Sequence, residues 1–171
     1  MVKKILNNIT MYTTYKELPH NARIWVYQSN RELTTKEVEI ISEKATEFIN
    51  QWTRHGDDLR GSFIIKYNHF LVLAVDESFN NVSGCSIDAS VRFVKGIEEM
   101  LKIDFMDKMN VSFKDRDMIN ILKLSEFQKF AKAQKITSNT IVFNNMVNTK
   151  EDFETKWEVP ADQSWHKRFL V

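Results

Sequence analysis

The chain has 171 residues, of which 43% are hydrophobic and 12% aromatic, and this composition predicts one globular domain (1–171) rather than a disordered or fibrous protein. Lysine and arginine total 24 against 23 acidic residues, with no block of five like charges, so no general attraction to nucleic acid or anionic lipid is expected. The longest apolar run has six residues, whereas a bilayer span needs about 20, and the first residues lack a signal-peptide pattern. We therefore expect a cytoplasmic protein without a membrane partner.

The first half of the chain predicts a strand followed by a well-marked helix. Residues 23–29 are short and rich in β-branched and aromatic side chains, which favours a strand. Thr34 and Glu37 have capping-box spacing, and Leu33 and Val38 occupy the hydrophobic-staple positions. Helical spacing continues through Val38, Ile41, Ala45, Phe48, Ile49 and Trp52. The helix is predicted to end at His55 and Gly56.

Residues 62–67 and 70–76 predict a hairpin whose turn is Asn68-His69. Residues 70–77, FLVLAVDE, also have the outline of the magnesium-binding Walker B strand of ATPases. The matching phosphate loop requires G-x-x-x-x-G-K-[ST], and the nearest segment, GDDLRGSF at residues 56–63, lacks the lysine. We therefore predict that FLVLAVDE is the second arm of a hairpin.

A second helix is predicted to carry Ile87, Val91, Val94, Ile97 and Leu101. Gly96 lowers the helix propensity of this segment, so we expect close packing against a neighbour there. Residues 109–114 are weakly strand-like. Segment 103–124 has no clear assignment beyond this, because residues 118–124 fit both periods poorly.

The second half predicts two short helices. Ser125 and Gln128 are expected to cap the first, which carries Phe127, Phe130 and Ala131. Residues 139–147 are strand-like. Thr149 and Asp152 are expected to cap the second, which carries Phe153 and Trp157 and is stopped by Pro160. Residues 1–17 form an N-terminal extension, and the tail at 160–171 is expected to pack on the body because it is too apolar to remain in solvent.

These segments predict an α+β fold with a mixed, largely antiparallel sheet and helices packed on it. The first half has the β-α-β-β-α-β order of ferredoxin-like proteins, and a C-terminal α-β-α part extends it.

Several long runs resemble one known family. They are LPHNARIWVYQSNREL, HGDDLRGSFIIKYNHF, VLAVDESFNNVSGCSIDASVRFVK and VFNNMVNTKEDFETKWEVPADQSWHKRFL. They are similar to small uncharacterised bacterial proteins that are often automatically labelled "ABC transporter ATPase", and the resemblance covers nearly all residues from about Leu18 onward. It implies no established activity, and that label requires an ATP site. Besides the phosphate loop, the LSGGQ signature is missing, since residues 82–86 (VSGCS) share only a serine and a glycine with it.

Polar chemistry is concentrated where the second predicted helix begins. Ser83, Gly84, Cys85 and Ser86 would offer free backbone N–H groups, two hydroxyls and a thiol at a helix N-terminus, which is a setting that holds anions. Asp88 and Arg92 follow on the same helix. The alternative is structural: a serine caps the helix, Asp88 complements its dipole, and Cys85 is a small buried hydrophobic residue.

A helix N-terminus also lowers the pKa of a cysteine, so Cys85 is a candidate nucleophile. A histidine would have to act as its base, with His55, His69 and His166 as candidates and Asp76 or Asp88 to orient it. Because Cys85 is the only cysteine, an internal disulfide is excluded, and no metal-ligand spacing links the four histidines. We expect no metal and no cofactor.

Trp165-His166-Lys167-Arg168 forms a second candidate ligand site, since an aromatic ring with cations suits phosphate or a nucleobase. In the competing interpretation Trp165 and Phe169 anchor the tail and the charges face water. Trp52 and Trp157 lie on predicted apolar helix faces and are expected in the core.

Three functional hypotheses follow. The first is a non-catalytic binding or regulatory protein that holds a small anionic ligand at Ser83–Ser86, with help from Arg92 or Arg168. The second is a thiol-dependent hydrolase or transferase that uses Cys85. The third is a module that binds a protein partner through an exposed apolar patch.

Overall fold

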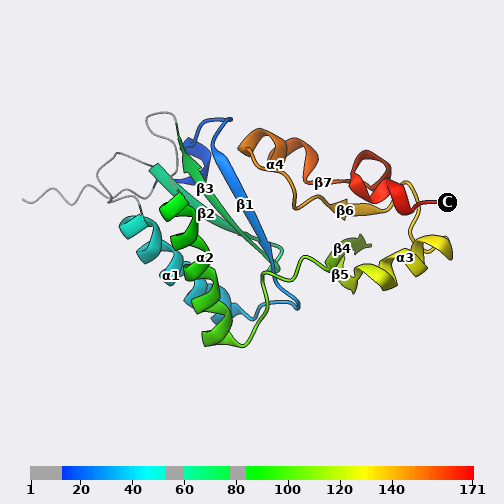
Figure 1. Cartoon of the computed structure of the whole chain (residues 1–171), viewed down its shortest axis with the longest axis horizontal. Coiled ribbons are helices and arrows are strands. Elements are labelled where there is room, and N and C mark those ends of the chain that lie inside the picture. The colour runs from blue at the N-terminus through cyan, green and yellow to red at the C-terminus, as the bar shows by residue number, and fades with distance from the viewer. Residues whose placement is uncertain (1–12, 53–59, 78–83) are drawn as a thin grey trace, which may run out of the picture.

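The computed structural model describes residues 13–52, 60–77 and 84–171, with the backbone alone for residues 84–86. Within these residues the fold is α+β, as predicted, with four α-helices and two antiparallel sheets. The first half runs in the order β1 (Arg23–Gln28), α1 (Thr35–Trp52), β2 (Arg60–Lys66), β3 (Phe70–Asp76), α2 (Gly84–Leu101) and β4 (Asn110–Asp115). The second half adds β5 (Met118–Lys123), α3 (Leu124–Lys132), β6 (Ile141–Phe143), α4 (Lys150–Lys156) and β7 (Glu158–Pro160) (Figure 1).

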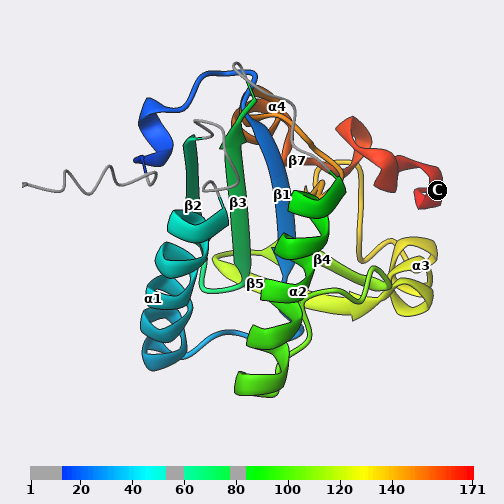
Figure 2. The same ribbon diagram turned by 60° about the vertical axis from the view of Figure 1, so that its left-hand side comes forward.

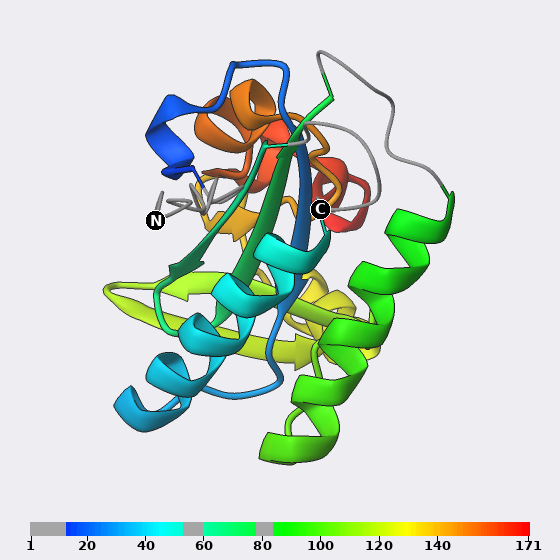
Figure 3. The ribbon, with the colours of Figure 1, turned by 90° about the vertical axis from the view of Figure 1, so that its left-hand side faces the viewer.

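The first sheet has the strand order β1-β3-β2, so the apolar strand β3 lies in its centre. Helices α1 and α2 lie side by side on one face, where Leu71 and Leu73 pack (Figures 2 and 3). Phe70 and Val72 face the other side and pack in a cluster with Phe143. Because β3 is buried on both faces, its six apolar residues need no alternation with polar ones. Burial in the core therefore explains why the sequence of β3 resembles a Walker B strand.

The second sheet has the order β5-β4-β6-β7. The predicted order of segments is confirmed, but β4 pairs with β5 and β6 and does not join the first sheet as the fourth strand of a ferredoxin-like unit would. Strand β5 lies in the segment that fitted neither period. It is an edge strand with its middle residues half-buried, so its apolar pattern is weak. Arg116, with φ 55°, lies in the turn from β4 to β5.

Local signals placed the starts of α1 and α4 correctly. The capping box at α1 is present, with the Thr34 N–H donating to Glu37 Oε2 at 2.9 Å and the Glu37 N–H donating to Thr34 Oγ1 at 3.2 Å. Thr149 caps α4 by accepting from the Asp152 N–H at 3.1 Å. The predicted end of α1 at residues 55–56 lies outside the described residues.

The predicted cap of α3 is wrong. This helix begins at Leu124 with Lys123 at the N-cap position and no side-chain cap, so Ser125 lies inside the first turn. Leu124 donates its N–H to the Met109 carbonyl oxygen at 2.8 Å, which ties the helix start to the beginning of β4. A tertiary hydrogen bond therefore sets this boundary instead of a local cap.

The expectation of close packing at Gly96 is also wrong. Gly96 lies on an exposed face of α2, and a Cβ added there would meet no described atom within 4 Å. The hairpin turn is one residue longer than predicted, because Tyr67 and Asn68 both have positive φ, at 54° and 52°, and the His69 N–H donates to the Lys66 carbonyl oxygen.

Both ends of the described chain pack on the body. At the C-terminus, as expected, the 3₁₀ helices η2 (Ala161–Gln163) and η3 (Trp165–Phe169) cover the second sheet and α3. Near the N-terminus, η1 (Tyr15–Glu17) is followed by the buried Leu18. Trp52 and Trp157 are core residues, as predicted. Among the helices described, not one combines the length and hydropathy needed to cross a bilayer.

Candidate functional site

The best-formed candidate site is a pocket of about 460 Å³ on the side of the first sheet away from α1 and α2. Figure 1 shows the second sheet and the C-terminal segment on this side of β1. The pocket is lined by side chains from β1, from residues 105–112, from the segment at and after β6, and from η3. We call it the inter-sheet pocket. Its volume lies within the range of small-molecule sites in proteins.

Four side chains in and beside this pocket form a hydrogen-bonded relay. Trp157 Nε1–H donates to Asn145 Oδ1 at 2.9 Å, and Asn145 Nδ2–H donates to Gln28 Oε1 at 2.9 Å. Ser112 Oγ–H donates to the same Gln28 oxygen at 2.6 Å. Gln28 and Ser112 are buried, so these bonds satisfy groups that would otherwise be costly to remove from water. The relay fixes the Gln28 amide in one orientation.

His166 is the buried titratable group of the inter-sheet pocket. Its side chain is fully buried, and Nδ1 lies 2.9 Å from Ser164 Oγ. Burial, assisted by the nearby positive charge of Arg168, lowers the pKa of His166 to about 4, so the imidazole is neutral at pH 7. Its Nε2 has no hydrogen-bond partner among the described residues. A buried polar atom left without a partner calls for an explanation, and a missing ligand is one.

Trp165 and Arg168 extend the site from η3. The Trp165 ring stacks on His166 with ring centroids 3.7 Å apart, and its buried Nε1–H also lacks a partner among the described residues. The Arg168 guanidinium lies 5.3 Å from the Trp165 ring centroid and 4.8 Å from that of Phe169. Stacking on two rings limits the freedom of an exposed arginine.

One wall of the pocket, residues 105–110, is held by backbone hydrogen bonds to acidic side chains. Glu98 Oε1 accepts from the N–H groups of Phe105 at 2.8 Å and Met106 at 3.1 Å. Asp104 Oδ1 accepts from Met106 and Asp107 at 2.9 and 3.0 Å. The wall is therefore built before any ligand arrives.

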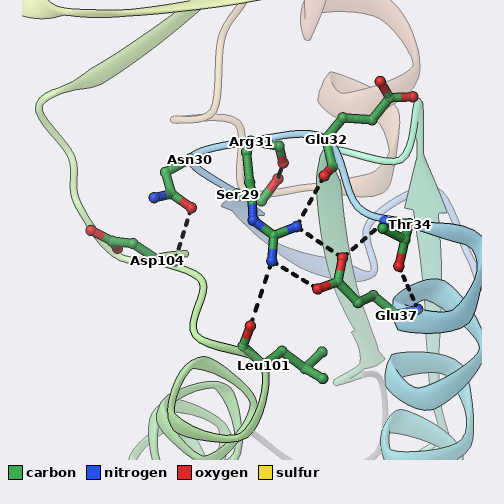
Figure 4. A network of polar contacts seen from close by, with 8 residues as sticks. All are labelled: Ser29, Asn30, Arg31, Glu32, Thr34, Glu37, Leu101 and Asp104. Carbon is green, nitrogen blue, oxygen red and sulfur yellow. Dashed lines mark hydrogen bonds and ion pairs between the residues drawn. The ribbon is translucent and has the colours of Figure 1, made fainter.

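The same wall is tied to the first sheet by the network in Figure 4. The Asn30 side chain accepts from the Asp104 N–H at 3.1 Å, and the Asn30 N–H donates to the Asp104 carbonyl oxygen at 2.9 Å. Arg31 forms a two-pronged ion pair with Glu37 at 2.7 and 2.9 Å and also reaches the Leu101 carbonyl oxygen (Figure 4). Arg31 therefore links the start of α1 to the end of α2.

The predicted site residues fall into separate places. Trp165, His166 and Arg168 all line the inter-sheet pocket. His69 lies elsewhere, in the β2–β3 turn, with Nδ1 2.8 Å from the Tyr67 carbonyl oxygen. Asp76 is buried and accepts from Arg60 at 3.1 Å across the β2–β3 pair.

The anion site predicted at Ser83–Ser86 cannot be compared with these positions. Ser83 and His55 lie outside the described residues, as do the side chains of Cys85 and Ser86, and Gly84 is described as the first residue of α2. Asp88 and Arg92 are described and are exposed on α2, apart from the residues that line the inter-sheet pocket. The role of Cys85 stays a prediction.

Sequence reasoning missed Gln28, Ser112 and Asn145. Gln28 is the last residue of β1 and follows four hydrophobic residues, which is a weak signal, and the other two stand in segments without a distinctive pattern. They are 84 and 117 positions from Gln28 along the chain, so only the packing of the two sheets brings them together.

Comparison with known proteins gives no relative from which a function can be carried over. No family model, no curated protein and no solved structure matches the chain. A function can therefore be inferred only from the geometry of the inter-sheet pocket.

Proposed function

We propose that this protein is a small non-catalytic binding or regulatory protein whose ligand occupies the inter-sheet pocket. One observation carries the proposal: His166 is fully buried at the wall of a pocket of about 460 Å³, with Nε2 unpartnered among the described residues. A ligand that bonds to Nε2 would remove the cost of that unpartnered atom. The relay around Gln28 supplies further polar groups that are already held in place.

The lining residues favour binding over catalysis. The Ser112 hydroxyl donates to an amide oxygen instead of a base, so nothing in that contact activates it as a nucleophile. Asp107 is ion-paired with Lys123, and the pKa of His166 is far below neutrality, which makes the imidazole a weak base. Binding specificity needs none of these groups to ionise.

The proposal also sets aside an ATPase activity. The strand FLVLAVDE is buried on both faces, and its aspartate, Asp76, is ion-paired with Arg60 at 3.1 Å. A magnesium ion bound to Asp76 would have to compete with that pair. A thiol-dependent reaction at Cys85 and an anion site at Ser83–Ser86 remain as competing proposals from the sequence.

A ligand screen followed in matched variants tests the proposal. A broad set of small molecules is screened by ligand-observed NMR and by thermal shift on the full chain, since a ligand that binds only the folded state raises the melting temperature. Hits are then measured with Arg168→Gln at the pocket and with Arg92→Gln as the matched control. Both arginines are exposed, so neither change should unfold the protein.

We expect hits that lose affinity in Arg168→Gln and keep it in Arg92→Gln. The reverse pattern would move the binding site to α2 and the predicted anion site at Ser83–Ser86. Loss of binding in Cys85→Ser alone would favour the thiol proposal.

A further inference from the structure

We propose that the ligand of the inter-sheet pocket is an organic acid: one carboxylate joined to an apolar chain or ring. This inference rests on the proposed binding function and adds the chemical class of the ligand. It follows from four properties of the pocket, which are the orientation of an amide, the tautomer of a histidine, the balance of charges and the apolar surface.

The hydrogen-bonded relay leaves the Gln28 NH₂ group able to donate to a ligand. The indole N–H of Trp157 can only donate, so the Asn145 atom that meets it must be the oxygen, and the other end of Asn145 must be NH₂. That NH₂ donates to Gln28, so the receiving atom of Gln28 is its oxygen. The Gln28 NH₂ group then has one long contact, 3.5 Å to the Asn110 carbonyl oxygen, and can donate to a ligand.

The Ser164 contact favours a donor at His166 as well. Ser164 is buried, and its hydroxyl has one hydrogen-bond partner among the described residues, His166 Nδ1. A buried hydroxyl places its proton on an acceptor, so the O–H donates to Nδ1 and the ring proton lies on Nε2. The Nε2 atom is thus an N–H group. Trp165 Nε1 is a second N–H without a partner among the described residues, and both residues line the pocket. A ligand atom that accepts hydrogen bonds would give these N–H groups a partner.

The charges at the pocket favour an anion. Arg168 and Lys108 both line the pocket and are exposed, and neither has an ion-pair partner among the described residues. The one acidic residue among the lining residues, Asp107, is neutralised by Lys123. The Arg168 guanidinium lies 5.3 Å from the centroid of the Trp165 ring, which stacks on the imidazole of His166. A carboxylate beside Arg168 would accept charge-assisted hydrogen bonds from the guanidinium.

The rest of the pocket is apolar, which limits the anion to one with a hydrocarbon body. The aliphatic and phenyl side chains of the lining are those of Val26, Phe105, Met106, Val111, Leu124, Phe143 and Met146. The pocket volume of about 460 Å³ corresponds to roughly 15 water molecules at about 30 Å³ each, which is room for one ring or a medium-length chain. Inorganic phosphate would leave this surface uncovered.

Matched probes that differ only in the polar group provide the test. The acids are phenylacetate, 3-phenylpropionate and octanoate, and each is compared with its primary amide and with an amine of the same skeleton. Inorganic phosphate is included as an anion without an apolar body. Dissociation constants are measured by NMR titration at pH 7 on the wild-type chain, Arg168→Gln, His166→Asn and the control Arg92→Gln.

We expect the acids to bind at least about tenfold more tightly than the amides and amines, because only the acids gain charge-assisted hydrogen bonds. Arg168→Gln should weaken acid binding about tenfold while Arg92→Gln leaves it unchanged. Because Arg168 is exposed, this result does not depend on whether His166→Asn folds.

Amides or amines that bind as tightly as the acids would overturn the assignment of an acid and leave the binding function standing. The same holds if none of the acids binds while another class from the broad screen occupies the pocket. Absence of any ligand from both sets would overturn the acid and the binding function together.

Discussion

Replacement of His166 by asparagine should change how the stability of the protein depends on pH. His166 is fully buried, and its pKa in the folded state is lowered to about 4 from an ordinary 6.5. Between these two values the unfolded chain binds a proton that the folded chain does not, so the free energy of unfolding falls as pH falls from 6.5 toward 4. Asparagine can keep a hydrogen bond to Ser164 but cannot take up that proton.

The size of the effect follows from the two pKa values. At pH 7 the difference in proton binding costs the folded state only about 0.2 kcal/mol, at pH 5 about 2 kcal/mol, and at pH 4 about 3 kcal/mol. The lost ring also packs against Trp165 and Phe127, so His166→Asn should be less stable than the wild type at pH 7 by about 1–3 kcal/mol. That packing loss is the same at every pH and does not affect the slope.

Urea denaturation followed by circular dichroism at pH 7, 6 and 5 measures both the packing loss and the pH-dependent cost of proton binding. We expect the gap between the wild type and His166→Asn to narrow by about 2 kcal/mol from pH 7 to pH 5. Arg92→Gln is the control, because it replaces an exposed side chain and removes no histidine, so its gap to the wild type should stay constant. A gap that is the same at pH 7 and pH 5 for His166→Asn would show that the imidazole is not held neutral by burial.

Three further predictions concern stability elsewhere in the fold. Gly96→Ala should raise the free energy of unfolding by about 1 kcal/mol in urea, because a methyl group at this exposed helical position meets nothing, and a loss of stability would mean that the position is packed. Glu37→Gln should lower stability at pH 7 by about 1–2 kcal/mol after allowance for solvent at the half-exposed Arg31. The pKa of Glu37 is lowered to about 2, chiefly by its hydrogen bonds with Arg31, so this loss should fade between pH 4.5 and pH 2 in acid titrations of both proteins, and a constant loss would refute the ion pair as its cause. Lys150→Met should cost about 1–3 kcal/mol in thermal unfolding at pH 7, because the buried ammonium donates to the Leu18 carbonyl oxygen at 2.8 Å, and an unchanged melting temperature would rule out that role.

The elements whose signals are local could be predicted from the sequence. Thr34 and Glu37 form two hydrogen bonds three positions apart, and Thr149 accepts one from Asp152 at the same spacing. Both helix starts are therefore specified by a few neighbouring residues. The apolar run of β3 likewise indicated a strand, and its pairing with β2 confirms the predicted hairpin. These features depend on backbone hydrogen bonds and burial that neighbouring residues already specify.

Predictions failed where a distant segment decides the outcome. The start of α3 depends on a bond from Leu124 to Met109, and the half-exposed edge strand β5 has no strong period because much of it faces solvent. Gly96 was expected to be packed because glycine lowers helix propensity, yet the residues around that position leave it open. In each case the outcome depends on which other segments lie nearby in the fold, and the local sequence does not specify those segments.

The candidate site shows the same division. The sequence by itself indicated an α+β protein, its main helices and hairpin, and a tail with Trp165, His166 and Arg168 as candidate ligand residues. Only the tertiary structure brought Gln28, Ser112 and Asn145 beside that tail and buried His166 deeply enough to lower its pKa. The physical reason is that helix caps and strand burial depend on residues close in sequence, whereas a pocket depends on where two sheets pack, which no short segment specifies.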